Sequence, residues 1–278
     1  MTRPVVPPPV IPPFDSSAAW ANVTRLVAAN ADVLIAIAGV FFLLPMLAWS
    51  VFVAPPSVTA QMDEQQLAQV LQDYYTHNLP YLLPISLMQI TGFITMLVGI
   101  LDRRRPTVGE ALRNCAARVP AYFISQILVG LFAFTLMMAV AAVLAALHVP
   151  MIVAAAAGMV AMLYPMLRTI MVGPVLGVGR THNPLMAIRA SIALTRGNVG
   201  RILAFLGLAG VLFAIVYGLT MMIVGLAAQM LLGAQSDIAR LVSDAISALL
   251  YSAGYTYFVV MLAAIHGQLT RDLPRPFS

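Results

Sequence analysis

Six long apolar runs constrain the fold of this chain more than any other feature of its sequence. A bilayer core about 30 Å thick takes about 20 residues of α-helix per crossing, so runs of this length predict transmembrane helices. The predicted spans cover residues 33–53, 79–101, 119–147, 151–168, 202–232 and 241–266. We therefore expect an all-α, polytopic membrane protein with six transmembrane helices.

The composition supports a membrane protein with one membrane domain. Hydrophobic residues make up 61% of the 278 residues and charged residues only 9%, whereas about 25% of an average soluble domain is charged. Residues 1–14 hold six prolines and are expected to form an extended tail, because proline excludes the helical apolar region of a signal peptide. Residues 15–268 are predicted to form a single integral membrane domain, and residues 269–278 a cytoplasmic tail.

The basic residues are all arginine, and they are distributed unevenly between the two ends of the predicted spans. Fourteen of the 15 arginines fall on the side of the N-terminus, and Arg240 alone falls on the other side. Basic residues are enriched in cytoplasmic loops, so we predict that both termini are cytoplasmic, in a bacterial inner membrane. The triplet Arg103, Arg104 and Arg105 would then anchor the inner end of the second span.

Short interfacial helices are predicted to precede three pairs of spans. Thr107 and Glu110 have the spacing of a capping box. Asn183 precedes a first-turn proline, and Asp15 or Ser16 is a suitable cap for the earliest helix. Each helix is expected to lie on the cytoplasmic leaflet, and together they indicate a threefold repeat of interfacial helix and transmembrane hairpin. Chance similarity among Ala- and Leu-rich segments is the competing explanation.

Three local features are expected to modify the spans. Pro45 is predicted to kink the first span. Residues 62–75 are predicted to form a separate amphipathic helix on the outer side. The glycines and proline of residues 169–180 predict that the helix of the fourth span is broken or frayed near the interface.

The third interfacial helix carries a short motif, Ala-aliphatic-x-x-Ser followed by Leu-Thr-x-Gly. Its residues are Ala187, Ile188, Ser191, Leu194, Thr195 and Gly197. This pattern, with the related segment 107–128, resembles that of YciC-type inner-membrane proteins and of the membrane domain of some bacterial glycerophosphoryl diester phosphodiesterases. The resemblance covers the region from Arg105 to the fifth span and implies a polytopic membrane fold of largely unknown role. The phosphodiesterase chemistry of that family belongs to a separate soluble domain, for which this chain is expected to have no room.

Patterns that would indicate catalysis or metal binding are sparse. His77 and His148 are expected outside the membrane and His182 and His266 inside, so the four cannot share one metal. The single cysteine, Cys115, excludes an intrachain disulfide and a thiol-rich metal site. No His-Glu-x-x-His, Cys-x-x-Cys or P-loop motif is present. We expect no catalytic residue, no cofactor, no metal and no nucleic-acid partner.

The candidate site is a set of inner-face arginines that contact lipid headgroups. Its members are Arg103, Arg104, Arg105, Arg113, Arg168, Arg180, Arg189, Arg196 and Arg201. An arginine near an anionic leaflet gains about 1 kcal/mol of attraction. We therefore expect a non-enzymatic integral inner-membrane protein that contacts anionic lipid and supports envelope or lipid homeostasis, with membrane lipids and membrane proteins as partners. The structural alternative for Arg168 is a side chain that snorkels from the fourth span.

A transporter or permease-like subunit is the alternative function. The repeat and the interrupted fourth span favour it, since interrupted helices often flank a substrate path. Tyr251, Tyr255 and Tyr257 would then line a polar cavity, although aromatic belts explain them equally well. Gln89 and Gln126 are expected to bridge helices by hydrogen bonds or to serve in packing. The sequence leaves the ligand and the oligomeric state open.

Overall fold

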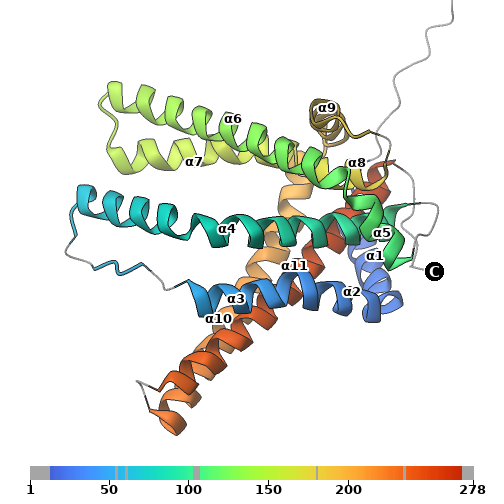
Figure 1. Cartoon of the computed structure of the whole chain (residues 1–278). Coiled ribbons are helices and arrows are strands. Elements are labelled where there is room, and N and C mark those ends of the chain that lie inside the picture. The colour runs from blue at the N-terminus through green and yellow to red at the C-terminus, as the bar shows by residue number, and fades with distance from the viewer. Residues whose placement is uncertain are drawn as a thin grey trace, which may run out of the picture.

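The computed structural model describes residues 13–53, 56–59, 62–102, 107–179, 181–233 and 236–270. These residues are almost entirely helical, and they contain no strand (Figure 1). Six helical segments are long and apolar enough to cross a membrane. They are the series α2, η1 and α3 (Ala31–Ala38, Gly39–Leu43 and Leu44–Phe52), α4 (Glu64–Leu101), α6 (Arg118–Ala146), α7 followed by α8 (Met151–Arg168 and Val172–Gly177), α10 (Val199–Leu232) and α11 (Asp237–Thr270). The predicted all-α fold with six spans is confirmed.

The first span changes its helical pitch before Pro45. Residues Gly39–Leu43 form a π-helical turn, and Pro45 lies in the first turn of α3. Proline lacks an amide hydrogen and its ring displaces the carbonyl four residues earlier, and a wider turn is one way to accommodate this. The Ser252 hydroxyl of α11 donates to the Ala38 carbonyl at 3.2 Å, so a neighbouring span supplies a donor where the turn begins.

The second span is longer than the sequence suggested. The predicted separate helix over residues 62–75 is wrong, because α4 runs without interruption from Glu64 to Leu101 with Pro80 and Pro84 inside it. Asp63 starts the helix through a capping box with Gln66. At 1.5 Å per residue α4 is about 57 Å long, so its first turns extend beyond a hydrocarbon core of about 30 Å. The end of the bundle at which α4 starts is termed the outer end, and the end at which α4 stops the inner end.

The break in the fourth span is confirmed, but the segment after the break is not frayed. After α7 ends at Arg168, the chain turns and forms α8, in which all six residues are buried. Gly173 allows this close packing, since a Cβ there would lie 2.4 Å from Cε1 of Phe93. The broken end is therefore part of the packed interior against α4.

Three short helices gather at one end of the bundle: α1 (Ser16–Ala29), α5 (Val108–Cys115) and α9 (Pro184–Leu194). All three are capped as predicted, by Asp15, by Thr107 with Glu110, and by Asn183. Their contacts are cyclic: α5 packs on α4, α9 packs on α8, and α1 packs on α11 (Figure 1). Each short helix thus covers the end of the preceding hairpin, and α1 closes the ring. A threefold repeat of helix and hairpin would produce this arrangement.

The predicted N-terminal tail ends earlier than residue 14. Phe14 is buried and its ring meets Phe205 edge-on, with centroids 5.5 Å apart. Its amide donates to the Asn198 side chain at 2.9 Å. Phe14 therefore belongs to the folded domain, while residues 1–12 and 271–278, which make up most of the two predicted tails, lie outside the described residues.

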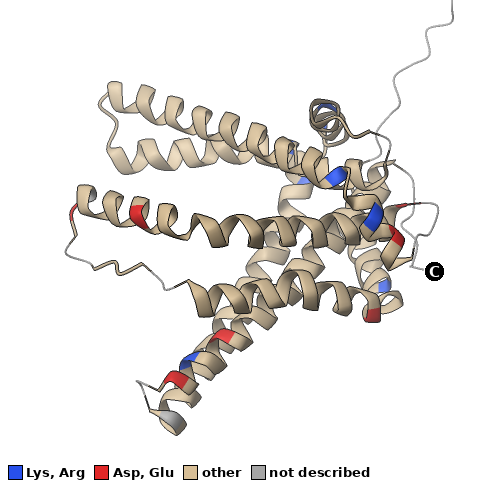
Figure 2. Cartoon of the chain, viewed as in Figure 1, with Lys and Arg blue, Asp and Glu red and all other residues tan. Residues whose placement is uncertain are grey.

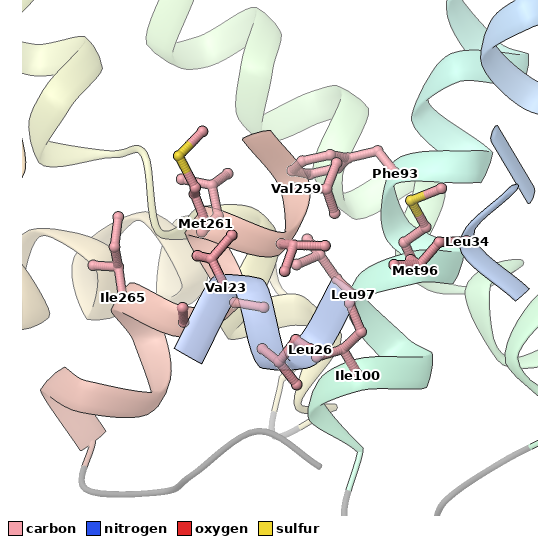
Figure 3. Packing of buried hydrophobic residues seen from close by; sticks show 14 of the residues in the cluster. Val23, Leu26, Leu34, Phe93, Met96, Leu97, Ile100, Val259, Met261 and Ile265 are labelled. Carbon is pink, nitrogen blue, oxygen red and sulfur yellow. The ribbon is translucent and has the colours of Figure 1, made fainter. Parts of the chain in front are cut away.

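The hydrophobic core lies at the end of the bundle that holds the short helices (Figure 3). It joins α1, α4 and α11 through residues such as Val23, Leu26, Phe93, Leu97 and Ile265. In contrast, α6, α7 and α10 expose most of their apolar side chains, and the far ends of the α6–α7 hairpin and of α10 lie well apart (Figure 1). Exposed apolar surface on this scale requires a lipid environment. The chain is a multi-pass integral membrane protein.

Candidate functional site

The end of the bundle with the short helices is rich in arginine (Figure 2). Of the nine predicted lipid-contact residues, Arg103, Arg104, Arg105 and Arg180 lie outside the described residues. The five described members are at this end, and all but one of them are exposed. The exposed ones are Arg113, Arg189, Arg196 and Arg201, and Arg168 at the end of α7 is half-buried. Arg25 of α1, which the predicted set did not include, is exposed as well.

The third short helix, α9, presents arginine on the side that faces away from the bundle. Ala187 and Ser191 are fully buried on its inner side. With 3.6 residues per turn, Arg189 points to the opposite side. Arg196 follows in the turn after α9 and is exposed as well. The two guanidinium groups are therefore available to a surface outside the protein.

Helix α5 has the same polarity. Ala111 and Cys115 are buried against the bundle, whereas Arg113 is exposed. Leu112 is also exposed, so an apolar side chain stands beside the cation. A helix with one apolar and one basic side is typical of a segment in the plane of a membrane interface.

Two of the acidic residues at this end cap short helices, whereas Asp32 in the first turn of α2 is exposed. Glu110 accepts the Thr107 amide at 2.9 Å in the capping box. Asp15 accepts the Ser17 hydroxyl at 2.8 Å and the amides of Ala18 and Ser17. These hydrogen bonds, that of the Ser17 side chain first, lower the pKa of Asp15. Among the described residues at this end, seven arginines stand against four acidic side chains, so the face carries a net positive charge.

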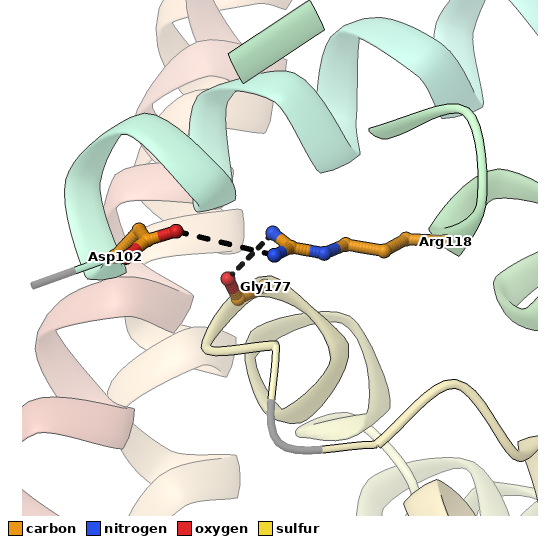
Figure 4. A network of polar contacts seen from close by, with 3 residues as sticks. All are labelled: Asp102, Arg118 and Gly177. Carbon is orange, nitrogen blue, oxygen red and sulfur yellow. Dashed lines mark hydrogen bonds and ion pairs between the residues drawn. The ribbon is translucent and has the colours of Figure 1, made fainter. Parts of the chain in front are cut away.

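One arginine at this end has a different role, which the sequence reasoning missed. Arg118, at the start of α6, is 7% exposed. Its Nη1 donates to the Gly177 carbonyl at 3.0 Å, and its Nη2 lies 3.9 Å from Oδ2 of Asp102 (Figure 4). Gly179 has a φ of 77°, and a Cβ there would approach Nη2 to 2.6 Å. Arg118 thus fastens together the ends of α4, α6 and α8, although by sequence it is one more arginine near a span end.

The serine and threonine of the family-like motif also prove to be structural. The Ser191 hydroxyl donates to the Arg168 carbonyl at 3.0 Å and accepts the Met171 amide at 3.1 Å. The Thr195 hydroxyl donates to the same carbonyl at 3.2 Å. Together they satisfy the backbone groups that the break between α7 and α8 leaves without helical partners. Gly197 adopts a φ of 79° in the turn that follows α9.

The four histidines are divided between the two ends of the bundle, as predicted. His77 lies in the outer part of α4 and His148 in the turn between α6 and α7, where its φ is 59°. His182 precedes α9 and His266 is buried near the inner end of α11. Among the described residues, no three side chains of His, Cys, Asp or Glu gather as a metal site would require.

An apolar groove lies between α10 and α11. Its volume is about 610 Å³, and Trp20 of α1 bounds it. A smaller depression of about 310 Å³ lies on the other side of α11, against α2 and η1. The groove between α10 and α11 is called the larger groove. Tyr251, Tyr255 and Tyr257 line this larger groove among apolar side chains. The expectation that these tyrosines line a polar cavity is therefore wrong, because the side chains around them in the groove are almost all apolar.

The two glutamines predicted to bridge helices differ in their contacts. Gln126 donates to the Tyr122 hydroxyl at 2.8 Å, which is one turn away on α6 itself. Gln89 of α4 shares a side-chain hydrogen bond with Tyr251 of α11. Only the second one joins two spans.

A polar pocket of about 620 Å³ lies at the opposite, outer end. It is formed by α3, the outer part of α4 and the first turns of α11. Arg240, Asp244 and Ser247 contribute its polar side chains, and Trp49 and Tyr74 contribute aromatic rings. No sequence pattern predicted this pocket, because its residues come from three distant segments.

Comparison of the chain with protein-family models, with curated proteins and with solved structures finds no match. What the chain does must accordingly be argued from its own surfaces, of which the arginine-rich inner face and the outer pocket are the two with polar chemistry.

Proposed function

We propose that this chain is a non-enzymatic inner-membrane protein whose cytoplasmic face binds anionic lipid and thereby supports envelope or lipid homeostasis. The observation that carries the proposal is the placement of exposed arginines on the outward sides of α5, α9 and the first turn of α10. In this account both termini and all three short helices are cytoplasmic, as the arginine distribution favours.

The charges on this face favour binding of anionic lipid over ion pairs within the protein. The described arginines of this face outnumber its acidic residues Asp15, Asp32, Asp102 and Glu110, so the face carries a net positive charge. Each arginine near an anionic leaflet contributes about 1 kcal/mol, and three of them contribute about 3 kcal/mol. That corresponds to roughly a 100-fold gain in affinity for an anionic surface.

The apolar groove beside α10 supports the same reading. Trp20 and Phe205 pack edge-on with centroids 6.4 Å apart, near the inner end of α10. The groove of about 610 Å³ continues from Trp20 toward the middle of the span. Arg201, one turn before Phe205, is exposed at the same end. An anionic phospholipid would place its phosphate near Arg201 and an acyl chain along the groove.

The test is lipid retention by a charge-neutral variant. We expect the triple variant Arg189→Gln, Arg196→Gln and Arg201→Gln, purified in mild detergent, to lose most of the phosphatidylglycerol and cardiolipin that the native protein retains, as measured by mass spectrometry. Asp237→Asn is the control, because it changes a charged side chain at the opposite end and lies outside the outer pocket. Equal anionic lipid on the native and triple-variant proteins would overturn the proposal.

A permease-like subunit is the second candidate, and one observation favours it. The polar pocket opens at the outer end while the inner end is packed around Phe93, Leu97 and Ile265. Such a shape fits one state of an alternating-access cycle. Substrate-dependent labelling of a cysteine placed at the inner end would support transport, and a packed inner end under all conditions would exclude it.

A further inference from the structure

The outer pocket contains one basic and one acidic side chain, Arg240 and Asp244, which do not pair with each other. Arg240 and Asp244 are four residues apart on α11, a spacing at which oppositely charged side chains ordinarily pair. Within the described residues their side chains form no ion pair or hydrogen bond, with each other or with a third group. The pocket thus holds an available cation and an available anion about 5–6 Å apart at their Cβ atoms.

Asp244 lies near the outer end of α11. Asp244 and His266 are 22 residues apart on α11, about 33 Å of helix, which matches the thickness of a hydrocarbon core. Because His266 lies near the inner end, Asp244 lies at the outer boundary of the bilayer. Asp244 is half-buried there. A half-buried carboxylate that lines a pocket and has no partner among the described side chains is available to a cationic ligand group.

Aromatic side chains complete the recognition surface. Trp49 of α3 and Tyr74 of α4 line the same pocket as Asp244, and both are half-buried. Aromatic rings beside a carboxylate attract an ammonium group by cation–π and ionic interactions together. Ser247 is fixed by a bond of 2.8 Å to the Tyr217 hydroxyl, which holds α10 against α11 at this level.

We propose that the outer pocket binds a zwitterionic group, with its ammonium against Asp244, Trp49 and Tyr74 and its anionic group on Arg240. The volume of about 620 Å³ is within the range of small-ligand sites. Two sources have this chemistry, the headgroup of an outer-leaflet phospholipid and a free zwitterionic solute. Val51 and Phe52 on the rim are 64% and 65% exposed, so the pocket borders on lipid. The inference does not depend on lipid binding at the inner face.

Binding can be followed through Trp49 alone. The chain has two tryptophans, so Trp20→Phe leaves Trp49 as the only indole reporter. In nanodiscs of pure phosphatidylglycerol, we expect phosphocholine to change Trp49 fluorescence in a saturable way. Choline alone and inorganic phosphate alone should bind at least tenfold more weakly, because each uses only one of the two charges.

Charge variants separate the pocket from nonspecific effects. Asp244→Asn should weaken phosphocholine binding at least tenfold, and Arg240→Gln should do the same. Asp237→Asn, on the exposed first turn of the same helix and outside the pocket, should leave binding unchanged. Helicity and the thermal midpoint of each variant show whether it is folded. Equal binding by Asp244→Asn and Asp237→Asn, or equal binding of choline and phosphocholine, would overturn the inference.

A second arm distinguishes the two sources. If a lipid headgroup occupies the pocket, adding phosphatidylethanolamine to the nanodiscs should shift Trp49 fluorescence and block the response to phosphocholine. If the ligand is a free solute, phosphatidylethanolamine should have no effect and glycine betaine should bind as phosphocholine does. Loss of inner-face lipid in the triple arginine variant would not alter either result.

Discussion

Arg118 donates a hydrogen bond of 3.0 Å to the carbonyl of Gly177, 59 positions later in the chain. Asp102, at the end of α4, lies on the other side of the same guanidinium (Figure 4). One side chain therefore connects three helix ends at the base of the bundle, where the three short helices also meet.

Removing this guanidinium should destabilise the fold. Arg118→Gln leaves the buried Asp102 carboxylate without its ion-pair partner and frees the Gly177 carbonyl, and loss of a buried partner typically costs about 3–5 kcal/mol. We expect a clearly lower thermal midpoint in detergent, and Arg118→Lys should restore little because lysine lacks the planar fork. Arg113→Gln, an exposed arginine close by, should leave the midpoint nearly unchanged. Equal midpoints for Arg118→Gln and Arg113→Gln would contradict this role.

Removing a hydroxyl group that caps the break between α7 and α8 should also destabilise the protein. Ser191→Ala removes the acceptor of the Met171 amide and a donor to the Arg168 carbonyl, which should cost about 1–3 kcal/mol. Thr135→Ala is the control, since the Thr135 hydroxyl bonds only a carbonyl of its own helix. Thermal unfolding in the same detergent compares the two. If both variants unfold alike, the hydroxyl of Ser191 does not support the break.

A side chain added at Gly173 should disturb the packing of α8 on α4. Gly173→Ala would place a methyl group 2.4 Å from the ring of Phe93, and overpacking of this kind typically costs about 1–3 kcal/mol. Gly218→Ala meets nothing within 4 Å and lies within α10, so it should be neutral or stabilise by about 0.5–1 kcal/mol. Opposite shifts of the thermal midpoint are expected, and a shift of the same sign in both would show that α8 is not tightly packed on α4.

The stability of the first short helix, α1, should depend on pH through Asp15. Its pKa is lowered in the folded protein, so its contribution to stability is present above the unfolded value of about 3.8 and is lost as the pH falls through the folded value. Asparagine also caps helices but does not titrate. Hydrogen exchange of α1 should therefore differ between the native protein and Asp15→Asn near pH 6 and converge below pH 3. A constant difference over this range would refute the link to Asp15.

The features that the sequence predicted correctly are those set by local physics. Span positions follow from runs of apolar residues, and the start of α5 follows from Thr107 and Glu110, whose side chains and backbone lie within one turn. The continuity of α4 through Pro80 and Pro84 was missed, since the residues before them looked like an independent amphipathic helix.

The residues of the candidate site also fall into two groups: those whose placement follows from the local sequence, and those whose placement depends on distant segments. Exposure of Arg113 and Arg189 follows from the amphipathic pattern of their helices. The burial of Arg118 does not, because it depends on Asp102 and Gly177 from two other segments. The outer pocket likewise exists only after α3, α4 and α11 have come together.

The central claim is that the arginine-rich end of the bundle faces the cytoplasm. It can be tested in intact bacteria that express the chain, in a Cys115→Ala background, with a membrane-impermeant maleimide. Ser57→Cys lies in the exposed loop between α3 and α4, and Ala116→Cys lies in the exposed turn between α5 and α6. We predict labelling of Ser57→Cys in intact cells and of Ala116→Cys only after lysis. Labelling of Ala116→Cys in intact cells, with Ser57→Cys protected, would contradict the account.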